Sequence, residues 1–235
     1  ARNLFMVTET NTKLKLLSTL DNVSRWVAPN NRLNSLNLDL NENCLGKTDD
    51  FFLNQLRNFD PYVISRYPEY DNILKDLQTY TGVSKDQILL TNGADQGIEL
   101  ICRLFFRPGA RVLVPSPVFS YYYHVLNLLG SSIIPIHYHK QKCNFIFPLL
   151  NLLNNIPNSD GVILCNPNNP LGISISLDDL EQVIYKCNSH KVPCIIDEAY
   201  FEFHGQTAVP FMKNFKNILI IRSFSKFFCL AGLRL

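Results

Sequence analysis

One lysine, Lys226, lies in a segment of small and apolar residues directly after a predicted strand. Neighbouring phenylalanines such as Phe224 and Phe227 would partly remove it from water, which lowers the pKa of the ammonium group and exposes an amine nucleophile. Ser223 and Arg234 flank it, and a hydroxyl with a guanidinium suits a phosphate dianion held beside an aldehyde. Taken alone, however, a loop lysine more often keeps its charged end in water.

A carboxylate lies at the end of another apolar run. Asp197 closes the segment PCIID (193–197), and Tyr200 follows three residues later. A carboxylate at the tip of a buried strand must be paired with a partner or take up a proton. Without further context, an aspartate at this place serves at least as often as the cap of a following helix.

Three loops of unusual composition accompany these residues. Segment 165–172 (CNPNNPLG) contains two X-Pro steps, which force extended backbone and a turn. Segment 91–100 (TNGADQGIEL) passes from a predicted strand into a helix, whose free N–H groups attract phosphate. Segment 114–123 carries Phe119, which either belongs to a core or stacks on a flat ligand.

Strands and helices that could position these residues alternate along the chain. Short apolar runs predict strands over 87–91, 111–115, 132–136, 161–165, 193–197 and 217–223. Helical spacing predicts helices over 48–59, 69–80, 94–106, 118–130, 147–154 and 176–187, and a further apolar, helix-like stretch covers Leu14–Trp26.

Apolar strands without alternation, separated by amphipathic helices, indicate a sheet covered on both faces. We therefore predict an α/β domain with a mostly parallel sheet, in which ligands bind at the carboxyl ends of the strands. Residues 1–47 are polar and rich in asparagine, and we assign them to an N-terminal segment, with one large domain over 48–235.

Segment 223–234 (SFSKFFCLAGLR) resembles the lysine motif of the fold-type I aminotransferases, which depend on pyridoxal 5′-phosphate (PLP). Segments 38–46, 65–83, 91–100, 114–123, 165–172 and 195–200 resemble other motifs of this family, in the family's order. The resemblance implies a three-layer α/β/α large domain with a mostly parallel sheet. It also implies that Lys226 is the Schiff-base lysine.

The resemblance also implies a role for each matching residue. Lys226, Asp197 and Tyr200 would be catalytic, with Asp197 facing the pyridinium nitrogen and Tyr200 sharing the phenolic oxygen with Asn169. Phe119 would stack on the ring. The phosphate would be held by Ser223, Ser225, Arg234, Ala94, Asp95 and Gln96, of which Gln96 replaces the glutamate that is usual in the family.

Two N-terminal segments are similar to those of the histidinol-phosphate aminotransferase subfamily. One is LDLNENCLG (38–46), where Cys44 replaces the usual proline, and the other is the RYPE segment that contains Tyr67. The resemblance implies a homodimer in which Tyr67 reaches the coenzyme phosphate of the neighbouring subunit. The implied reaction, in histidine biosynthesis, converts L-histidinol phosphate and 2-oxoglutarate to imidazole-acetol phosphate and glutamate.

Two other interpretations stay open. Another PLP enzyme of the same subgroup, such as an aromatic-amino-acid aminotransferase or a threonine-phosphate decarboxylase, shares the N-terminal motifs. A non-catalytic remnant of the fold is the second. In the family, further strands and a C-terminal small domain with a carboxylate-binding arginine follow the position of Leu235. We therefore expect a fragment or truncated product that lacks the small domain.

Composition excludes several classes of function. The formal net charge is +2 without a basic run, which disfavours nucleic acid or a membrane surface as partner. The seven cysteines are odd in number and form no CxxC, so we expect free thiols in a reducing, cytoplasmic compartment. No apolar run approaches a membrane span. His137 and His139 lack the further ligands of a metal site, so no metal is expected.

Overall fold

The computed structural model describes residues 32, 36–43 and 50–234. Its described residues form two compact units, one made of residues 32–90 and the other beginning at Thr91. The predicted helix-like stretch Leu14–Trp26 and the residue Cys44 lie outside the described residues. The predicted domain boundary after residue 47 falls in the gap between 43 and 50, and it stays a prediction.

A five-stranded parallel sheet forms the centre of the larger unit, with strand order β2-β1-β5-β6-β7. The strands are β1 (Arg111–Ser116), β2 (Ser132–His137), β5 (Gly161–Cys165), β6 (Cys194–Asp197) and β7 (Ile218–Ile221). Each overlaps a predicted strand, so the prediction of a mostly parallel α/β sheet is confirmed.

The helices of this unit connect the strands, as expected for parallel pairing. They are α4 (Gly93–Phe105), α5 (Tyr121–Leu128), α6 (Leu149–Asn155), α7 (Leu177–Ser189) and α8 (Phe201–His204), with 3₁₀ turns at Ile156–Asn158, Val209–Lys213 and Ala231–Leu233. The first turn of α7 is capped as its sequence predicts, because the Ser176 hydroxyl accepts a hydrogen bond from the Asp179 N–H at 3.1 Å.

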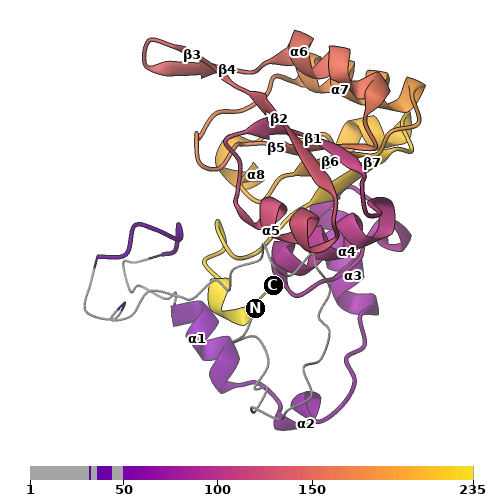
Figure 1. Cartoon of the computed structure of the whole chain (residues 1–235). Coiled ribbons are helices and arrows are strands. Elements are labelled where there is room, and N and C mark those ends of the chain that lie inside the picture. The colour runs from indigo at the N-terminus through magenta and orange to yellow at the C-terminus, as the bar shows by residue number, and fades with distance from the viewer. Residues whose placement is uncertain (1–31, 33–35, 44–49, 235) are drawn as a thin grey trace, which may run out of the picture. The chain divides into compact units, whose positions relative to one another are not determined.

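Helices α6 and α7 lie on one side of the sheet, and α4 and α5 lie on the other (Figure 1). Alternate residues of each strand pack against these opposite layers. The face toward α6 and α7 carries Leu113, Val162, Leu164, Cys194, Ile196 and Ile218, and the face toward α4 and α5 carries Val112, Val114, Ile163, Cys165, Ile195 and Ile221. Full burial of one such aliphatic side chain contributes about 1.5–3 kcal/mol. These two apolar layers hold the carboxyl ends of the strands in place and confirm the three-layer α/β/α architecture.

Gly161, the first residue of β5, offers a test of this packing. A Cβ atom at this position would overlap the ring of Phe106, which is itself buried in the core between the sheet and α4. We expect Gly161→Ala to lower the free energy of unfolding by about 1–3 kcal/mol, as overpacking does. Urea denaturation measures this, with Gly232→Ala as the control because no atom lies within 4 Å of a Cβ there. Equal stability of the two variants would contradict the described packing.

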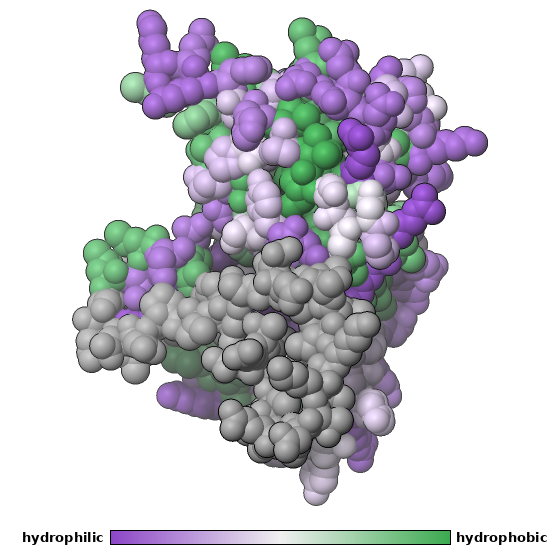
Figure 2. Space-filling model, viewed as in Figure 1, coloured by the Kyte–Doolittle hydropathy of each residue, from purple (hydrophilic) through white to green (hydrophobic). Residues whose placement is uncertain are grey.

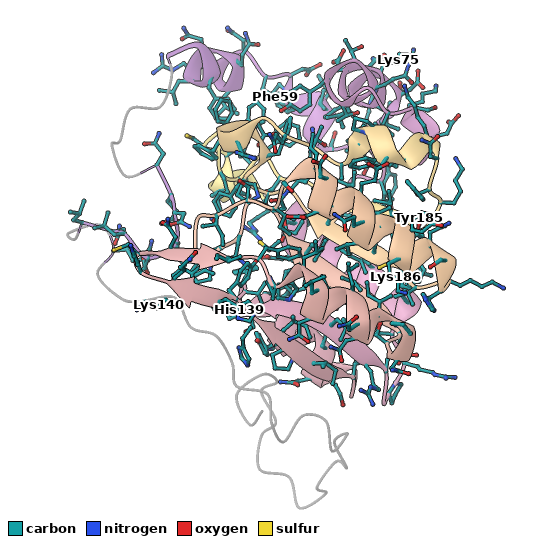
Figure 3. All side chains as sticks on the ribbon, turned by 90° about the horizontal axis from the view of Figure 1, so that it is seen from above. Phe59, Lys75, His139, Lys140, Tyr185 and Lys186 are labelled. Atoms are coloured by element: carbon teal, nitrogen blue, oxygen red, sulfur yellow. The ribbon has the colours of Figure 1, made fainter. Side chains whose placement is uncertain are left out.

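An antiparallel hairpin that the sequence did not predict follows β2. It consists of β3 (His139–Gln141) and β4 (Asn144–Ile146), and most of its residues are exposed. It is hydrophilic, at the upper left of Figure 2, and Figure 3 labels His139 and Lys140 on it. Polar residues on both faces give such a strand pair no apolar periodicity, so its sequence reads as a loop.

The smaller unit consists of short helices. They are α1 (Asp50–Arg57), α2 (Pro61–Ile64), α3 (Asp71–Thr81) and a 3₁₀ turn (Lys85–Gln87). Helix α3 ends where predicted, because Gly82 adopts a φ of 71° and its N–H donates to the carbonyl of Gln78 at 2.9 Å. The two predicted helices of this region, 48–59 and 69–80, are thereby confirmed within the described residues.

The predicted strand over 87–91 is wrong. Gln87 ends the 3₁₀ turn, and although Ile88 has extended backbone, no strand among the described residues pairs with this segment. Near its end, the Thr91 hydroxyl donates to the carbonyl of Gly93 at 2.9 Å, a local bond of a loop. An apolar run becomes a strand only where a neighbour accepts and donates its backbone hydrogen bonds.

Candidate active site

The predicted functional segments meet at one edge of the sheet. β5, β6 and β7 end in register at Cys165, Asp197 and Ile221. The ladder continues one residue further, since the N–H of Asn166 donates to the carbonyl of Asp197 and the N–H of Glu198 donates to that of Ile221, both at 2.8 Å. The loops that begin here carry Asn169, Tyr200 and Lys226, as the sequence predicted.

Asp197 is almost fully buried, at 3% exposure, and both of its carboxylate oxygens accept a hydrogen bond. The Tyr122 hydroxyl donates to Oδ2 at 2.7 Å, and the Ala199 N–H donates to Oδ1 at 3.0 Å. Burial raises the pKa of this carboxyl, while the two donors counteract the rise. Among the described residues no cationic side chain forms an ion pair with Asp197. A buried carboxylate held only by neutral donors suits a cationic ligand atom.

Tyr122 is a site residue that the sequence analysis did not single out. Its side chain is fully buried in α5, and burial raises the pKa of its hydroxyl well above the ordinary value. Its ring meets Phe119 edge-on, with centroids 6.4 Å apart and planes at 89°. The signal was its spacing in the sequence, three residues after Phe119 within the predicted helix 118–130. In the structure, Phe119 precedes α5, which begins at Tyr121.

The asparagine loop after β5 is shaped by two of its three asparagines. The side-chain oxygen of Asn166 accepts from the Ile175 N–H at 2.8 Å, and that of Asn168 accepts from the Leu171 N–H at 2.9 Å. The Asn168 amide also donates to the carbonyl of Pro117 at 3.1 Å, which ties this loop to the one after β1. Asn169, the predicted ligand, is partly buried, and the structure shows no hydrogen bond from its side chain to another described residue.

Lys226 is partly buried in the loop after β7, in keeping with the partial desolvation expected from its neighbours. The rings of Phe224 and Phe228 lie 5.0 Å apart, and those of Phe227 and Phe228 lie 5.4 Å apart. The Leu230 N–H donates to the carbonyl of Phe224 at 3.1 Å, which closes the loop around the lysine. The phenylalanine rings of this loop thus pack on one another, while Phe227 and Phe228 stay partly exposed.

Ser223 and Ser225 lie at the start of the same loop. Ser223 is buried, at 8% exposure, and its hydroxyl oxygen accepts from the Ser225 N–H at 3.1 Å. This bond makes a small turn directly after the sheet, two residues before Lys226. Both predicted phosphate-binding serines are thus placed between the sheet edge and the lysine.

The first turn of α4 and Arg234, far apart in sequence, come together. Nη2 of Arg234 donates to Oδ2 of Asp95 at 2.9 Å, and a Cβ atom on Gly93 would lie 3.6 Å from the same nitrogen. Both side chains of this ion pair are about half exposed, so the pair contributes little to stability and a phosphate could compete for the guanidinium. Ala94 lies in the same turn, and the Gln96 side-chain oxygen accepts from the Asn92 N–H at 2.7 Å.

A buried ion pair joins the strand ends that carry Asp197 and Lys226. Glu198 is fully buried, and it accepts from Arg222 at 2.9 Å, from the Thr207 hydroxyl at 2.8 Å and from the Ala208 N–H at 2.7 Å. The Arg222 guanidinium also lies 3.8 Å above the ring of Phe201. Neither Glu198 nor Arg222 was predicted from the sequence, where a charged residue after a strand reads as surface.

This ion pair gives a prediction on stability. Glu198→Gln leaves the Arg222 guanidinium without its counter-charge, and we expect the free energy of unfolding to fall by about 3 kcal/mol. Urea denaturation measures the change, with Glu181→Gln on the exposed surface of α7 as the matched control. Figure 3 labels Tyr185 and Lys186 on α7, the helix that carries this control position. A loss below about 0.5 kcal/mol would show that the pair does not hold these strand ends.

Tyr67, expected to act across a subunit interface, lies in the smaller unit. Its side chain is 99% exposed there. No second subunit is present, so its role stays a prediction.

Over residues 32, 36–43 and 50–234, no three histidine, cysteine, aspartate or glutamate side chains come together as metal ligands would. Within the same ranges, no helix combines the length and the apolar character needed to cross a membrane.

Comparison with known proteins places this geometry in a family. Histidinol-phosphate aminotransferase from Dehalococcoides mccartyi is 36% identical over 201 residues, which is 85% of this chain and 54% of that protein. The crystal structure of the enzyme of that name from Clostridium acetobutylicum matches with a TM-score of 0.69 and 30% identity, over 78% of this chain and 54% of that one. A putative one from Erwinia carotovora atroseptica matches with a TM-score of 0.73 and 25% identity, over 83% and 58%.

The matches also show how much of the length of each relative this chain spans. The chain spans about half the length of the curated relatives it matches. The family model for aminotransferase class I and II matches residues 34–235. The chain therefore belongs to the class I and II aminotransferase family.

Proposed function

We propose that this chain is the coenzyme-binding part of a PLP-dependent histidinol-phosphate aminotransferase. The relatives that carry this name are 33–36% identical to it over most of its length. The observation that carries the proposal is the buried Asp197 carboxylate, which accepts only from neutral donors within the described part of the chain and lies beside the strand that leads to Lys226. A pyridinium nitrogen would supply the missing positive charge.

The remaining residues fit the other parts of the coenzyme. Arg234, the turn of Ser223 and Ser225, and the first turn of α4 at Ala94, Asp95 and Gln96 offer cationic and hydrogen-bonding partners to a phosphate. Asn169 and Tyr200 would donate to the phenolic oxygen, and Phe119 would pack on the ring. In a homodimer, Tyr67 of the neighbouring subunit would complete the phosphate site.

The chemistry divides between the coenzyme and the chain. When bound, PLP supplies an aldehyde that takes up an amino group and a protonated ring that withdraws electrons. Lys226 would hold the coenzyme covalently, and its amine would take up the proton from the α carbon of the donor. Asp197 would keep the ring nitrogen protonated. The aromatic residues of the loop would limit the access of water to the amine.

We further propose the substrates, assembly and compartment that go with this assignment. The donor would be L-histidinol phosphate and the acceptor 2-oxoglutarate, in histidine biosynthesis. The enzyme would act as a homodimer in the cytoplasm, where cysteines stay reduced. The cysteines of the described residues are free, and Cys102, Cys165, Cys187 and Cys194 among them are buried.

An absorbance scan with added PLP tests the proposal. The wild-type chain should develop a visible band that borohydride abolishes. Addition of L-histidinol phosphate should bleach that band at lower concentration than addition of phenylalanine does. A preference for phenylalanine would indicate an aromatic-amino-acid aminotransferase, and the absence of any band would favour a non-catalytic remnant of the fold.

A further inference from the structure

We propose that Tyr122 is a positioning residue that keeps the Asp197 carboxylate ionised and oriented toward the ring nitrogen of the coenzyme. The inference rests on the proposed function, since it assigns Tyr122 a part in the same site. It concerns a residue that touches Asp197 and acts through it, 75 positions away in the sequence.

The geometry restricts Asp197 from two sides. Oδ2 receives the Tyr122 hydroxyl at 2.7 Å, and Oδ1 receives the Ala199 N–H at 3.0 Å. The second donor belongs to the backbone two residues further on, so it orients the carboxylate only relative to its own loop. Tyr122 comes from a different element, α5, and it therefore fixes the carboxylate relative to the helical layer that also carries Phe119.

The packing around Tyr122 makes this bond rigid. Its ring is fully buried in the core cluster that joins α4, α5 and the sheet, together with Ile98, Val114 and Ile195. A side chain so enclosed has few alternative rotamers, and its hydroxyl meets Oδ2 at a short, well-defined distance. Because the Tyr122 hydroxyl is already held in place, it loses little conformational entropy when it donates to the ionised carboxylate.

The electrostatics give the bond a functional consequence. Burial raises the pKa of Asp197, and the hydrogen bond from Tyr122 is the largest influence that lowers it again. A proton shared between Asp197 and the ring nitrogen resides on the nitrogen only while the carboxylate is the weaker base. Without the hydroxyl, the desolvated carboxylate would bind the proton more tightly and leave the ring nitrogen neutral.

The test uses the whole chain loaded with PLP that carries ¹⁵N at the ring nitrogen. The ¹⁵N chemical shift reports whether this nitrogen is protonated, and a spectral titration gives the affinity. Tyr122→Phe should move the shift toward that of the neutral nitrogen and weaken PLP binding by about 10-fold. Tyr123→Phe is the matched control, because it removes a hydroxyl from the same helix that bonds Ser116 at 2.9 Å.

A double variant separates positioning from packing. If Tyr122 acts through Asp197, adding Tyr122→Phe to Asp197→Asn should change the affinity by less than about twofold, whereas a general packing role makes the two losses multiply. If Tyr122→Phe does not fold, 4-aminophenylalanine at position 122 keeps a weaker donor of similar size. It should then give a shift between those of the charged and neutral nitrogen.

Each outcome decides the inference. A shift in Tyr122→Phe equal to that of the wild type, multiplying losses in the double variant, or a wild-type shift with 4-aminophenylalanine would overturn it and leave the proposed function intact. A wild-type chain that develops no borohydride-sensitive band would overturn the proposed function first, and the role of Tyr122 with it.

Discussion

The Lys226→Ala chain is expected to bind PLP without forming any bond that borohydride can reduce. The amine of Lys226 is the only group that we assign to covalent attachment, and alanine leaves nothing to replace it. In the proposed aminotransferase, loss of the proton transfer alone should slow transamination by about 10²- to 10⁴-fold. Absorbance before and after borohydride, followed by gel filtration, measures whether the coenzyme stays attached.

The control for this variant is Lys216→Ala. Lys216 is an exposed lysine in the loop before β7, and its loss changes the net charge by the same amount. The control should keep the visible band and its sensitivity to borohydride. A band that survives in Lys226→Ala would assign the attachment to another lysine and would contradict the site.

The second large effect is expected from Asp197→Asn. The substitution keeps the shape of the side chain but removes the charge that would face the ring nitrogen. Loss of one partner from a buried charge pair should weaken PLP binding by about 30-fold or more. A spectral titration measures this, and Asp178→Asn in the exposed first turn of α7 is the matched control, which should bind PLP as the wild type does. Equal affinity of Asp197→Asn and the wild type would refute the role of Asp197.

Without coenzyme, Asp197→Asn should gain stability relative to the wild type as the pH rises, although it weakens PLP binding. Burial raises the pKa of Asp197 above its ordinary value of 3.8 in the folded chain. As the pH rises from 3.8 through this raised pKa, the unfolded chain loses the proton first, so the wild-type free energy of unfolding falls across that window and then stays lower. The stability of Asp197→Asn relative to the wild type should therefore increase from pH 3.8 upward and then level off. Urea denaturation at pH values from about 3.5 to about 7 measures this difference in the free energy of unfolding. A difference that stays constant with pH would contradict the burial of a charged carboxylate.

Much of the fold could be predicted from the sequence, because the central strands β5 and β6 are fully buried. Runs such as 161–165 and 193–196 contain apolar residues or glycine at every position, which only a sheet covered on both faces can bury. The segment 87–91 has similar composition but no strand partner among the described residues, and composition alone does not report a partner. The hairpin β3–β4 failed for the opposite reason, since backbone pairing forms there without apolar side chains.

Some residues of the candidate site could likewise be predicted from the sequence, and others could not. The positions of Asp197, Asn169 and Lys226, at the end of a strand or in the loop after it, could be predicted because parallel strands bring their carboxyl ends to one edge. Their roles stay predictions. The contact between Asp95 and Arg234 was not predicted, although both residues were assigned to the phosphate site.

Contacts between distant elements were not predictable. Tyr122 reads as one tyrosine among three in a helix, and only the packing of α5 on the sheet brings its hydroxyl to Asp197. Glu198 follows a predicted strand and Arg222 lies near the end of another, and only the register of β6 with β7 shows that they form a pair in which Glu198 is fully buried. Such contacts depend on the tertiary arrangement, which no local pattern encodes.

Peptide mapping after reduction tests most directly whether Lys226 is the residue that binds PLP covalently. The wild-type chain is mixed with PLP, reduced with borohydride, digested and analysed by mass spectrometry. The account predicts that the added pyridoxyl phosphate mass is found on the peptide that contains Lys226 and at no comparable level elsewhere. Labelling spread over exposed lysines such as Lys213 and Lys216, or a Lys226 peptide without added mass, would contradict it.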